Sequence, residues 1–203
     1  RQVVTCFTCH RNRDRPLTTA TMEMLYGEPK VEPDDFLPKG DATPPADQIF
    51  DKYIAALGGA QRVNSLTSYV AKATVVAFGG FGNEAQAQIY AKAPNQRATI
   101  IEFKNAPGRD DSARTFDGRT GWVRTPLSVL GEYVQTGTEL DGARFDAQLA
   151  FPGQIRQILR NWRVSTPFDR INGREVYAVQ GDGVRGTFAT LYFDKETGLL
   201  TRS

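Results

Sequence analysis

Hydrophobic residues first follow a helical period near residue 46. Apolar side chains recur there at the i, i+1, i+4, i+5 and i+8 positions of one helix face, as Ile49, Phe50, Tyr53, Ile54 and Leu57. Asp47 is the predicted N-cap, because its carboxylate can accept hydrogen bonds from the free N–H groups of the first turn. Gly58 and Gly59 predict the end of the helix, since glycine readily adopts the left-handed conformation that terminates helices.

After this helix the pattern changes to alternation and β-branched runs, which indicate strands. We predict strands over residues 69–78, 85–93, 97–104, 114–116 and 122–123, helices over 142–149 and 154–161, and strands over 162–168, 175–181 and 187–194. Asn172-Gly173 predicts a tight hairpin turn. Successive strands without βαβ alternation predict an α+β fold, a mostly antiparallel sheet with helices on one side.

Four aromatic residues lie within these alternating strands. We expect them to line the core or a groove rather than to contact a cofactor: Phe103, Trp122, Tyr177 and Tyr192.

Residues 27–45 have a different composition from the rest of the chain. They contain several proline-bearing clusters and little apolar periodicity, which is typical of an extended, semi-rigid linker. The pattern therefore predicts three parts: a short segment over residues 1–26, a linker over 27–45 and a folded domain over 46–203.

Composition excludes some classes of function. The 25 basic and 23 acidic side chains leave a net charge of +2, whereas nucleic-acid binding needs a concentrated basic surface, so we expect no nucleic-acid partner. No window approaches the roughly 18 consecutive apolar residues of a transmembrane helix. The chain starts with Arg1 and has no signal-peptide pattern, so we expect it to be part of a longer precursor, with material also missing after Ser203.

The two cysteines and the single histidine of the chain all lie in one short motif, Cys6-Phe7-Thr8-Cys9-His10. C-x-x-C-H is the attachment pattern of a c-type haem. Two thiols three positions apart can form thioethers to both vinyl groups of one haem, and the adjacent imidazole then reaches the iron. We therefore predict one covalent haem c on Cys6 and Cys9, with His10 as an axial iron ligand.

Three other interpretations of the motif remain open. A structural zinc site would need a fourth ligand beyond these three. A thioredoxin-like redox pair normally follows a strand within a βαβ unit, and no strand precedes this motif. A plain disulfide between Cys6 and Cys9 would leave His10 without a role.

The distal iron ligand is less well defined by the sequence. Met22 and Met24, the only methionines, are candidate distal ligands, since a thioether can complete the coordination of the iron. Either side chain can instead simply pack against the haem or a neighbouring segment. A ligand from an upstream segment, a partner chain or water is the remaining alternative.

The residues around the motif, Val4-Thr5-Cys6-Phe7-Thr8-Cys9-His10-Arg11 with Pro16, resemble the last haem site of proteins related to the photosynthetic reaction-centre cytochrome c subunit. Relatives of that subunit are widespread in non-photosynthetic bacteria. In this family the distal methionine comes from a helix upstream of the motif. The resemblance covers about the first 16 residues and implies a c-type cytochrome.

A second resemblance covers roughly residues 46–203. The segment 47–59 resembles the first helix of domains often fused behind such cytochromes. The segments 89–97, 116–122 and 191–200 are similar to the outer-membrane lipoprotein carrier and sorting superfamily. This resemblance implies an antiparallel half-barrel sheet with helices packed on its concave side, and an apolar concave face that can hold acyl chains.

Together these features favour an exported c-type cytochrome that acts in electron transfer, with the half-barrel as a docking or scaffold domain. Covalent haem attachment takes place after export, so we expect a periplasmic or extracellular location, with the outer membrane as a candidate site of association. We expect redox proteins or other haem-bearing chains as partners. The alternatives are a periplasmic lipid or lipoprotein carrier with an accessory haem, and a structural subunit of a multi-haem assembly.

We expect an electron carrier rather than an enzyme. The chain has no histidine beyond His10 and no serine within a nucleophile elbow. The acidic pairs Asp34-Asp35 and Asp110-Asp111 are typical of loops rather than of a catalytic dyad.

Overall fold

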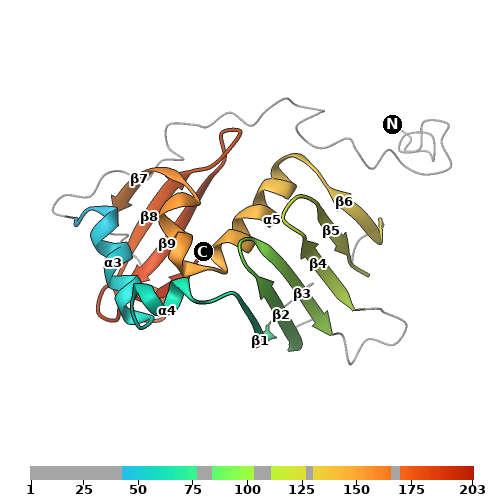
Figure 1. Ribbon diagram of the computed structural model, residues 1–203, viewed down its shortest axis with the longest axis horizontal. Coiled ribbons are helices and arrows are strands. Elements are labelled where there is room, and N and C mark those ends of the chain that lie inside the picture. Colours follow the sequence, from blue (N-terminus) through green and yellow to red (C-terminus); the bar gives the residue numbers. More distant parts are fainter. Residues whose placement is uncertain (1–42, 77–83, 103–110, 127–129, 166–169) are drawn as a thin grey trace, which may run out of the picture.

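The structure, a computed structural model, describes residues 43–76, 84–102, 111–126, 130–165 and 170–203. In these ranges helices accompany two antiparallel sheets (Figure 1). The predicted α+β class, with its antiparallel strands, is therefore confirmed. The described strands form two sheets rather than the single sheet expected from the sequence, because the chain leaves the first sheet through a helical segment before it starts the second.

The first sheet has six strands that follow one another in chain order, with every neighbouring pair antiparallel. They are β1 (Ser68–Val75), β2 (Ala85–Lys92), β3 (Gln96–Glu102), β4 (Ser112–Phe116), β5 (Gly121–Arg124) and β6 (Glu132–Gln135). The sequence did not predict β6, since its four residues are too few to establish an alternating pattern.

The second sheet has four strands in the order β10-β9-β8-β7. These are β7 (Arg160–Ser165), β8 (Val176–Asp182), β9 (Phe188–Asp194) and β10 (Leu200–Arg202). Asn172 and Gly173 form a tight turn at φ angles of 51° and 76°, closed by reciprocal backbone hydrogen bonds between Ile171 and Arg174. The turn predicted at Asn172-Gly173 is therefore confirmed.

Helix α3 (Ala46–Ala56) packs on the second sheet through the face that the sequence predicts. Phe50 is fully buried, and its ring meets Trp162 edge-on at 5.0 Å and Phe193 at 5.8 Å between centroids. Gly58 and Gly59, both at positive φ, end the helix with paired hydrogen bonds from their N–H groups to the carbonyls of Ala55 and Ile54. Helix α4 (Ala60–Asn64) follows directly.

The predicted N-cap of α3 is wrong. The helix begins at Ala46, and its N-cap is Pro45, two residues before the predicted cap; Pro45 is extended and provides no side-chain hydrogen bond. Asp47 therefore lies inside the first turn, where its carboxylate accepts a hydrogen bond from Arg156 Nε at 3.0 Å. Acidic residues are favourable in this turn because of the helix dipole, so the residue type was informative although its exact position was not.

The helices between the two sheets also differ from the prediction. Helix α5 (Gly137–Leu149) begins five residues before the expected start at 142. The helix predicted over 154–161 is wrong: residues Pro152–Gln157 form a short 3₁₀ helix, η3, and β7 begins at Arg160. Asn161 adopts a left-handed φ of 50°, which is incompatible with a continuing helix.

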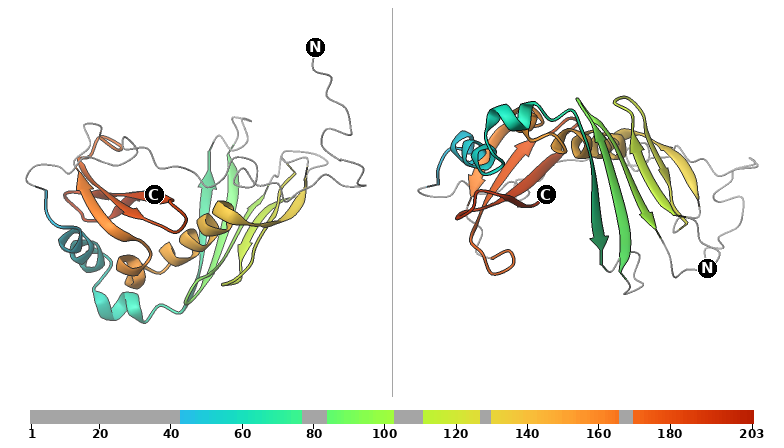
Figure 2. Two further views of the ribbon diagram at one scale, coloured as in Figure 1. Left: turned by 90° about the horizontal axis from the view of Figure 1, so that it is seen from above. Right: turned by 60° about the horizontal axis from the view of Figure 1, so that its bottom comes forward.

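Helix α5 lies between the two sheets (Figure 2). Its small residues Ala143 and Ala147 pack against Phe116 on the first sheet, with Leu140 at the edge of this cluster. The 3₁₀ helix η3 touches α3, α4 and α5, so it connects the helical elements that cover both sheets. The described residues thus form two hydrophobic cores, one on each sheet.

Candidate functional site

The residues predicted to bind haem lie outside the described part of the chain. Cys6, Cys9, His10 and both candidate distal ligands, Met22 and Met24, belong to residues 1–42. The described residues contain neither cysteine nor histidine, and no group of three His, Cys, Asp or Glu side chains is placed among them to hold a metal ion. The donor set of two thiols and one imidazole therefore remains a prediction from the sequence.

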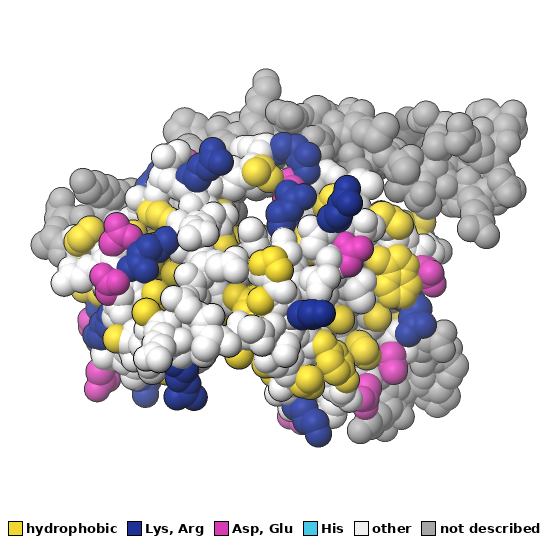
Figure 3. All heavy atoms as spheres, in the orientation of Figure 1, with side chains coloured by type: hydrophobic (Ala, Val, Ile, Leu, Met, Phe, Trp, Pro, Cys, Tyr) yellow, Lys and Arg dark blue, Asp and Glu magenta, His cyan; other side chains and the backbone are white. Residues whose placement is uncertain are grey.

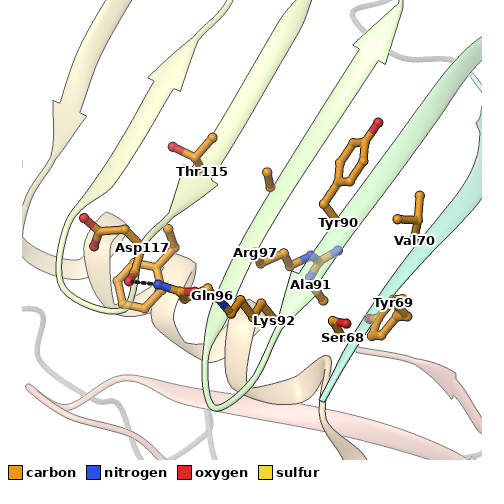
Figure 4. A pocket seen from close by; sticks show the side chains of 12 residues that line it. Ser68, Tyr69, Val70, Tyr90, Ala91, Lys92, Gln96, Arg97, Thr115 and Asp117 are labelled. Atoms are coloured by element: carbon orange, nitrogen blue, oxygen red, sulfur yellow. Dashed lines mark hydrogen bonds between the residues drawn. The ribbon is translucent and has the colours of Figure 1, made fainter. Parts of the chain in front are cut away.

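The described residues form several hollows, and two of these have mainly apolar linings. The larger of these two apolar hollows lies on the first sheet. Alternate residues of a strand point to opposite faces of its sheet, and one face of this sheet carries Phe116 and is covered by α5. We call the opposite face the outer face. A groove of about 490 Å³ lies on it, across β1 to β4, between two rows of side chains (Figure 4).

The first row of the groove is mostly apolar. It crosses the four strands in direct register as Val70, Tyr90, Ala98 and Thr115. Val70 is 62% exposed and Tyr90 is 40% exposed, although both are large apolar or aromatic side chains. The small side chains of Ala98 and Thr115 leave the middle of the sheet open.

The second row is polar, and hydrogen bonds hold two of its four members. It contains Ser68, Lys92, Gln96 and Asp117, and Gln96 Nε2 donates to the carbonyl oxygen of Asp117 at 2.8 Å (Figure 4). The carboxylate of Asp117 in turn accepts hydrogen bonds from the backbone N–H groups of Thr120 and Arg119, which lower its pKa. Asp117 therefore fixes the turn between β4 and β5.

The exposed tyrosine of the groove also has a fixed position. Tyr90 Oη donates to Gln88 Oε1 at 2.6 Å, and Gln88 Nε2 donates to Glu102 Oε1 at 2.9 Å. This chain of hydrogen bonds runs along the outer face and fixes the position of the phenol ring. The groove thus offers a rigid, largely apolar surface with a polar border, which suits contact with another molecule better than acid–base chemistry.

The second hollow is a cleft of about 280 Å³ between α5 and the β8–β9 hairpin. Apolar side chains such as Phe145, Leu159 and Phe188 form much of its lining. Beside it, the buried carboxylate of Asp141 on α5 pairs with Arg185 Nη2 at 2.6 Å and with Arg144 Nη1 at 3.3 Å. Arg185 belongs to the turn between β8 and β9, so this ion pair connects α5 to the second sheet.

The aromatic residues predicted to line a core or groove have varied environments. Trp122 is half-buried on the outer face of β5, next to Thr115 in the neighbouring strand. Tyr177 packs at the edge of the core on the second sheet, with Lys195 Nζ 4.9 Å from its ring centroid. Tyr192 lies under the guanidinium of Arg202 at 5.8 Å, and Phe103 lies outside the described residues.

The sequence did not predict either of the two apolar hollows. The alternation of residues 86–92 places Tyr90 on the polar side of its strand, and an aromatic residue at such a position was the only signal of the exposed row. The pairing of Asp141 with Arg185 had no sequence signal, because the two residues are brought together only when α5 packs beside the β8–β9 hairpin. The acidic pair Asp110-Asp111 is described only at Asp111, and Asp34-Asp35 is not described.

Comparison with known proteins gave no match, either to a protein-family model or to a curated protein sequence. Among the helices of the described ranges, none has the length and apolar character to cross a membrane.

Proposed function

We propose that this protein is an exported c-type cytochrome that acts in electron transfer. One observation carries the proposal: the only two cysteines and the only histidine of 203 residues form a single C-x-x-C-H motif. Cys6 and Cys9 would hold the haem through thioethers, and His10 would provide an axial nitrogen to the iron. When bound, the haem supplies a one-electron redox couple.

The folded domain then serves as a scaffold or docking domain. We propose that its two antiparallel sheets, with α5 between them, form the open half-barrel that the lipoprotein-carrier resemblance implies. The chain order of the six strands and the position of α5 support this. The partners would be redox proteins or other haem-bearing chains in the periplasm or outside the cell, near the outer membrane.

The haem is tested by expressing the chain in a host that exports it and attaches haem c. We expect the purified protein to carry one covalent haem by mass and to show the α-band of a c-type cytochrome in a reduced-minus-oxidised spectrum. Cys6→Ser with Cys9→Ser should abolish both signals, whereas Thr8→Ala, between the two cysteines, should retain them. A protein that binds zinc or forms a disulfide, without the spectrum, would rule the proposal out.

The distal ligand is tested separately. If Met22 or Met24 completes the coordination, the weak far-red absorption band of methionine–iron ligation should disappear in Met22→Ala or in Met24→Ala, but not in both. A band that survives both substitutions assigns the distal ligand to another segment or chain. Electron transfer itself predicts a reversible one-electron wave in voltammetry, and a haem that cannot be cycled would contradict it.

The cleft beside α5 favours a second candidate function, a lipid or lipoprotein carrier with an accessory haem. Its apolar lining suits an acyl chain, but its volume of about 280 Å³ is at the lower limit of typical ligand pockets, about 300 to 1,000 Å³. The cleft would therefore have to open to take a long chain. Native mass spectrometry of the purified protein should detect a co-purifying lipid, and its absence together with no uptake of a fluorescent fatty acid would rule the carrier out.

A further inference from the structure

The mostly apolar row on the outer face extends across all six strands of the first sheet. The register pairs each member with the next, so the row lies straight across the sheet as Val70, Tyr90, Ala98, Thr115, Trp122 and Val134. Val134, at the far end, is 56% exposed, similar to Val70 at the near end. Figure 3 shows hydrophobic side chains gathered over this sheet, with charged side chains among them.

An exposed apolar row of this extent needs a physical explanation. Single exposed hydrophobic residues are common, but a contiguous apolar patch on a protein surface usually marks an interaction site. The inner face of the same sheet is already covered by α5, so the outer face is not needed to build the core. The row therefore points to a partner.

The order of side-chain sizes in the row is nearly the same from either edge of the sheet. Valine occupies both edge strands, an aromatic residue comes next on each side, and the two central positions are small. A two-fold rotation about an axis parallel to the strands, between β3 and β4, exchanges β1 with β6 and β2 with β5. It therefore brings Tyr90 of one copy opposite Trp122 of the other, and Val70 opposite Val134.

The adjacent row repeats this symmetry in its charges. It lies two residues further along each strand and contains Lys72, Gln88, Ile100, Ala113, Arg124 and Glu132. The same rotation brings Lys72 opposite Glu132 at both ends of the interface, and Gln88 opposite Arg124. Opposite charges therefore meet twice, and no like charges face one another in the two rows.

The groove fits the same arrangement. It lies over β1 to β4, and the rotation places β5 of the second copy above β2. Trp122 of that copy then faces the groove, whose volume of about 490 Å³ lies within the range of pockets that hold drug-sized ligands, about 300 to 1,000 Å³. An indole ring is smaller than such a ligand, so the groove can receive it.

The available area agrees with a weak dimer. Six strands about 4.8 Å apart form a face roughly 25 to 30 Å wide, and strands of about six residues make it roughly 20 Å long. Two stacked faces would remove roughly 1,000 to 1,200 Å² from water in total, which is at the lower end of specific interfaces. Aligned face-to-face packing is also a common way for two antiparallel sheets to meet.

We propose that the outer face of the first sheet binds a second copy of this chain, as a two-fold dimer in which Lys72 of each copy meets Glu132 of the other. The proposal does not depend on the haem, so it stands or fails separately from electron transfer. Analytical ultracentrifugation of the full chain should show a monomer–dimer equilibrium at micromolar concentrations.

Charge reversal gives a sharp test of this geometry. Lys72→Glu and Glu132→Lys should each weaken dimerisation about tenfold or more, because two attractive contacts become repulsive in each homodimer. Mixing the two variants should restore the dimer, since in the mixed pair both contacts are again between opposite charges. Arg160→Glu and Glu196→Lys, at exposed positions associated with the second sheet, form the control pair and should change nothing, alone or mixed.

Trp122 and the oligomeric state of the unmodified chain provide two further tests of the dimer. Trp122→Ala should also weaken the dimer while the far-UV circular dichroism of the monomer stays unchanged. A chain that remains monomeric at several hundred micromolar would overturn the inference, as would a dimer that none of these substitutions affects. Crosslinks from residues 1–42 to the outer face in a monomer would assign the face to the chain's own N-terminal segment instead.

Discussion

Phe193 gives the most direct test of how the second sheet is held to α3. Its side chain is fully buried on β9, and its ring lies edge-on to Phe50 at 5.8 Å and to Tyr53 at 5.3 Å. Removing a buried phenylalanine costs about 3 to 5 kcal/mol of unfolding free energy, and each aromatic pair contributes about 0.5 to 1.5 kcal/mol beyond buried area. We therefore expect Phe193→Ala to lose about 4 to 5 kcal/mol in urea denaturation followed by circular dichroism.

Phe188 offers a matched control on the same strand, because its side chain is 39% exposed. Phe188→Ala should cost about 1 kcal/mol or less, as is usual for residues outside the core. Domains of ordinary stability have only about 5 to 15 kcal/mol in total, so a loss of this size can leave little folded protein. Phe193→Leu avoids this problem, because it keeps most of the volume but loses both ring pairs, and it should cost about 1 to 2 kcal/mol. Equal losses for Phe193→Ala and Phe188→Ala would refute the packing described for α3.

Three further predictions concern titration and packing. Hydrogen bonds from the backbone of the turn after β9 lower the pKa of Asp194 from 3.8 to about 2. The stabilisation by this carboxylate should therefore be present above pH 3.8 and lost as the pH falls through 2. In a plot of unfolding free energy against pH, Asp194→Asn should flatten the decline at acid pH. Burial raises the pKa of Tyr53 from 10.0 to about 12. The stabilisation by its neutral phenol should therefore be present below pH 10 and lost as the pH rises through 12. If the unfolding free energy of Tyr53→Phe fell in the same way at alkaline pH, this prediction would be wrong. Gly181→Ala would place a Cβ 2.7 Å from the ring of Trp162 and should cost about 1 to 3 kcal/mol of unfolding free energy, measured by thermal or urea unfolding. Gly142→Ala is the control on α5, where the added Cβ meets open space, and it should stabilise the fold by about 0.5 to 1 kcal/mol.

Local patterns predicted those elements whose structure depends on local chemistry. The apolar face of α3, its glycine end and the Asn172-Gly173 turn are each encoded within a few neighbouring residues, and all three are confirmed. The segment 154–161 shows the limit of this approach. Its apolar spacing suits a helix, but Ile155 is buried in the core within a 3₁₀ turn that starts at Pro152, and packing there decides the conformation.

The division into two sheets and the outer face depend on contacts between distant residues. Each strand of the first sheet pairs only with its chain neighbours, and no local signal states where a sheet ends and the next begins. The exposed row becomes visible only after the register of all six strands is known, because its members are spread from Val70 to Val134. The haem prediction, in contrast, depends on five consecutive residues only, so it can be made without knowing the fold.

The strand order also has a consequence for how the chain folds. In the first sheet every strand pairs with the one made just before it, and such short-range contacts cost little loop-closure entropy. Helix α3 is different, since Lys52 donates to the carbonyl of Lys195, 143 residues later, and the core around Phe50 needs β9. During synthesis, the six strands of the first sheet can therefore pair before the strands that pack against α3 have been made. We expect α3 to dock last, so that this domain is completed only after β9 has been synthesised.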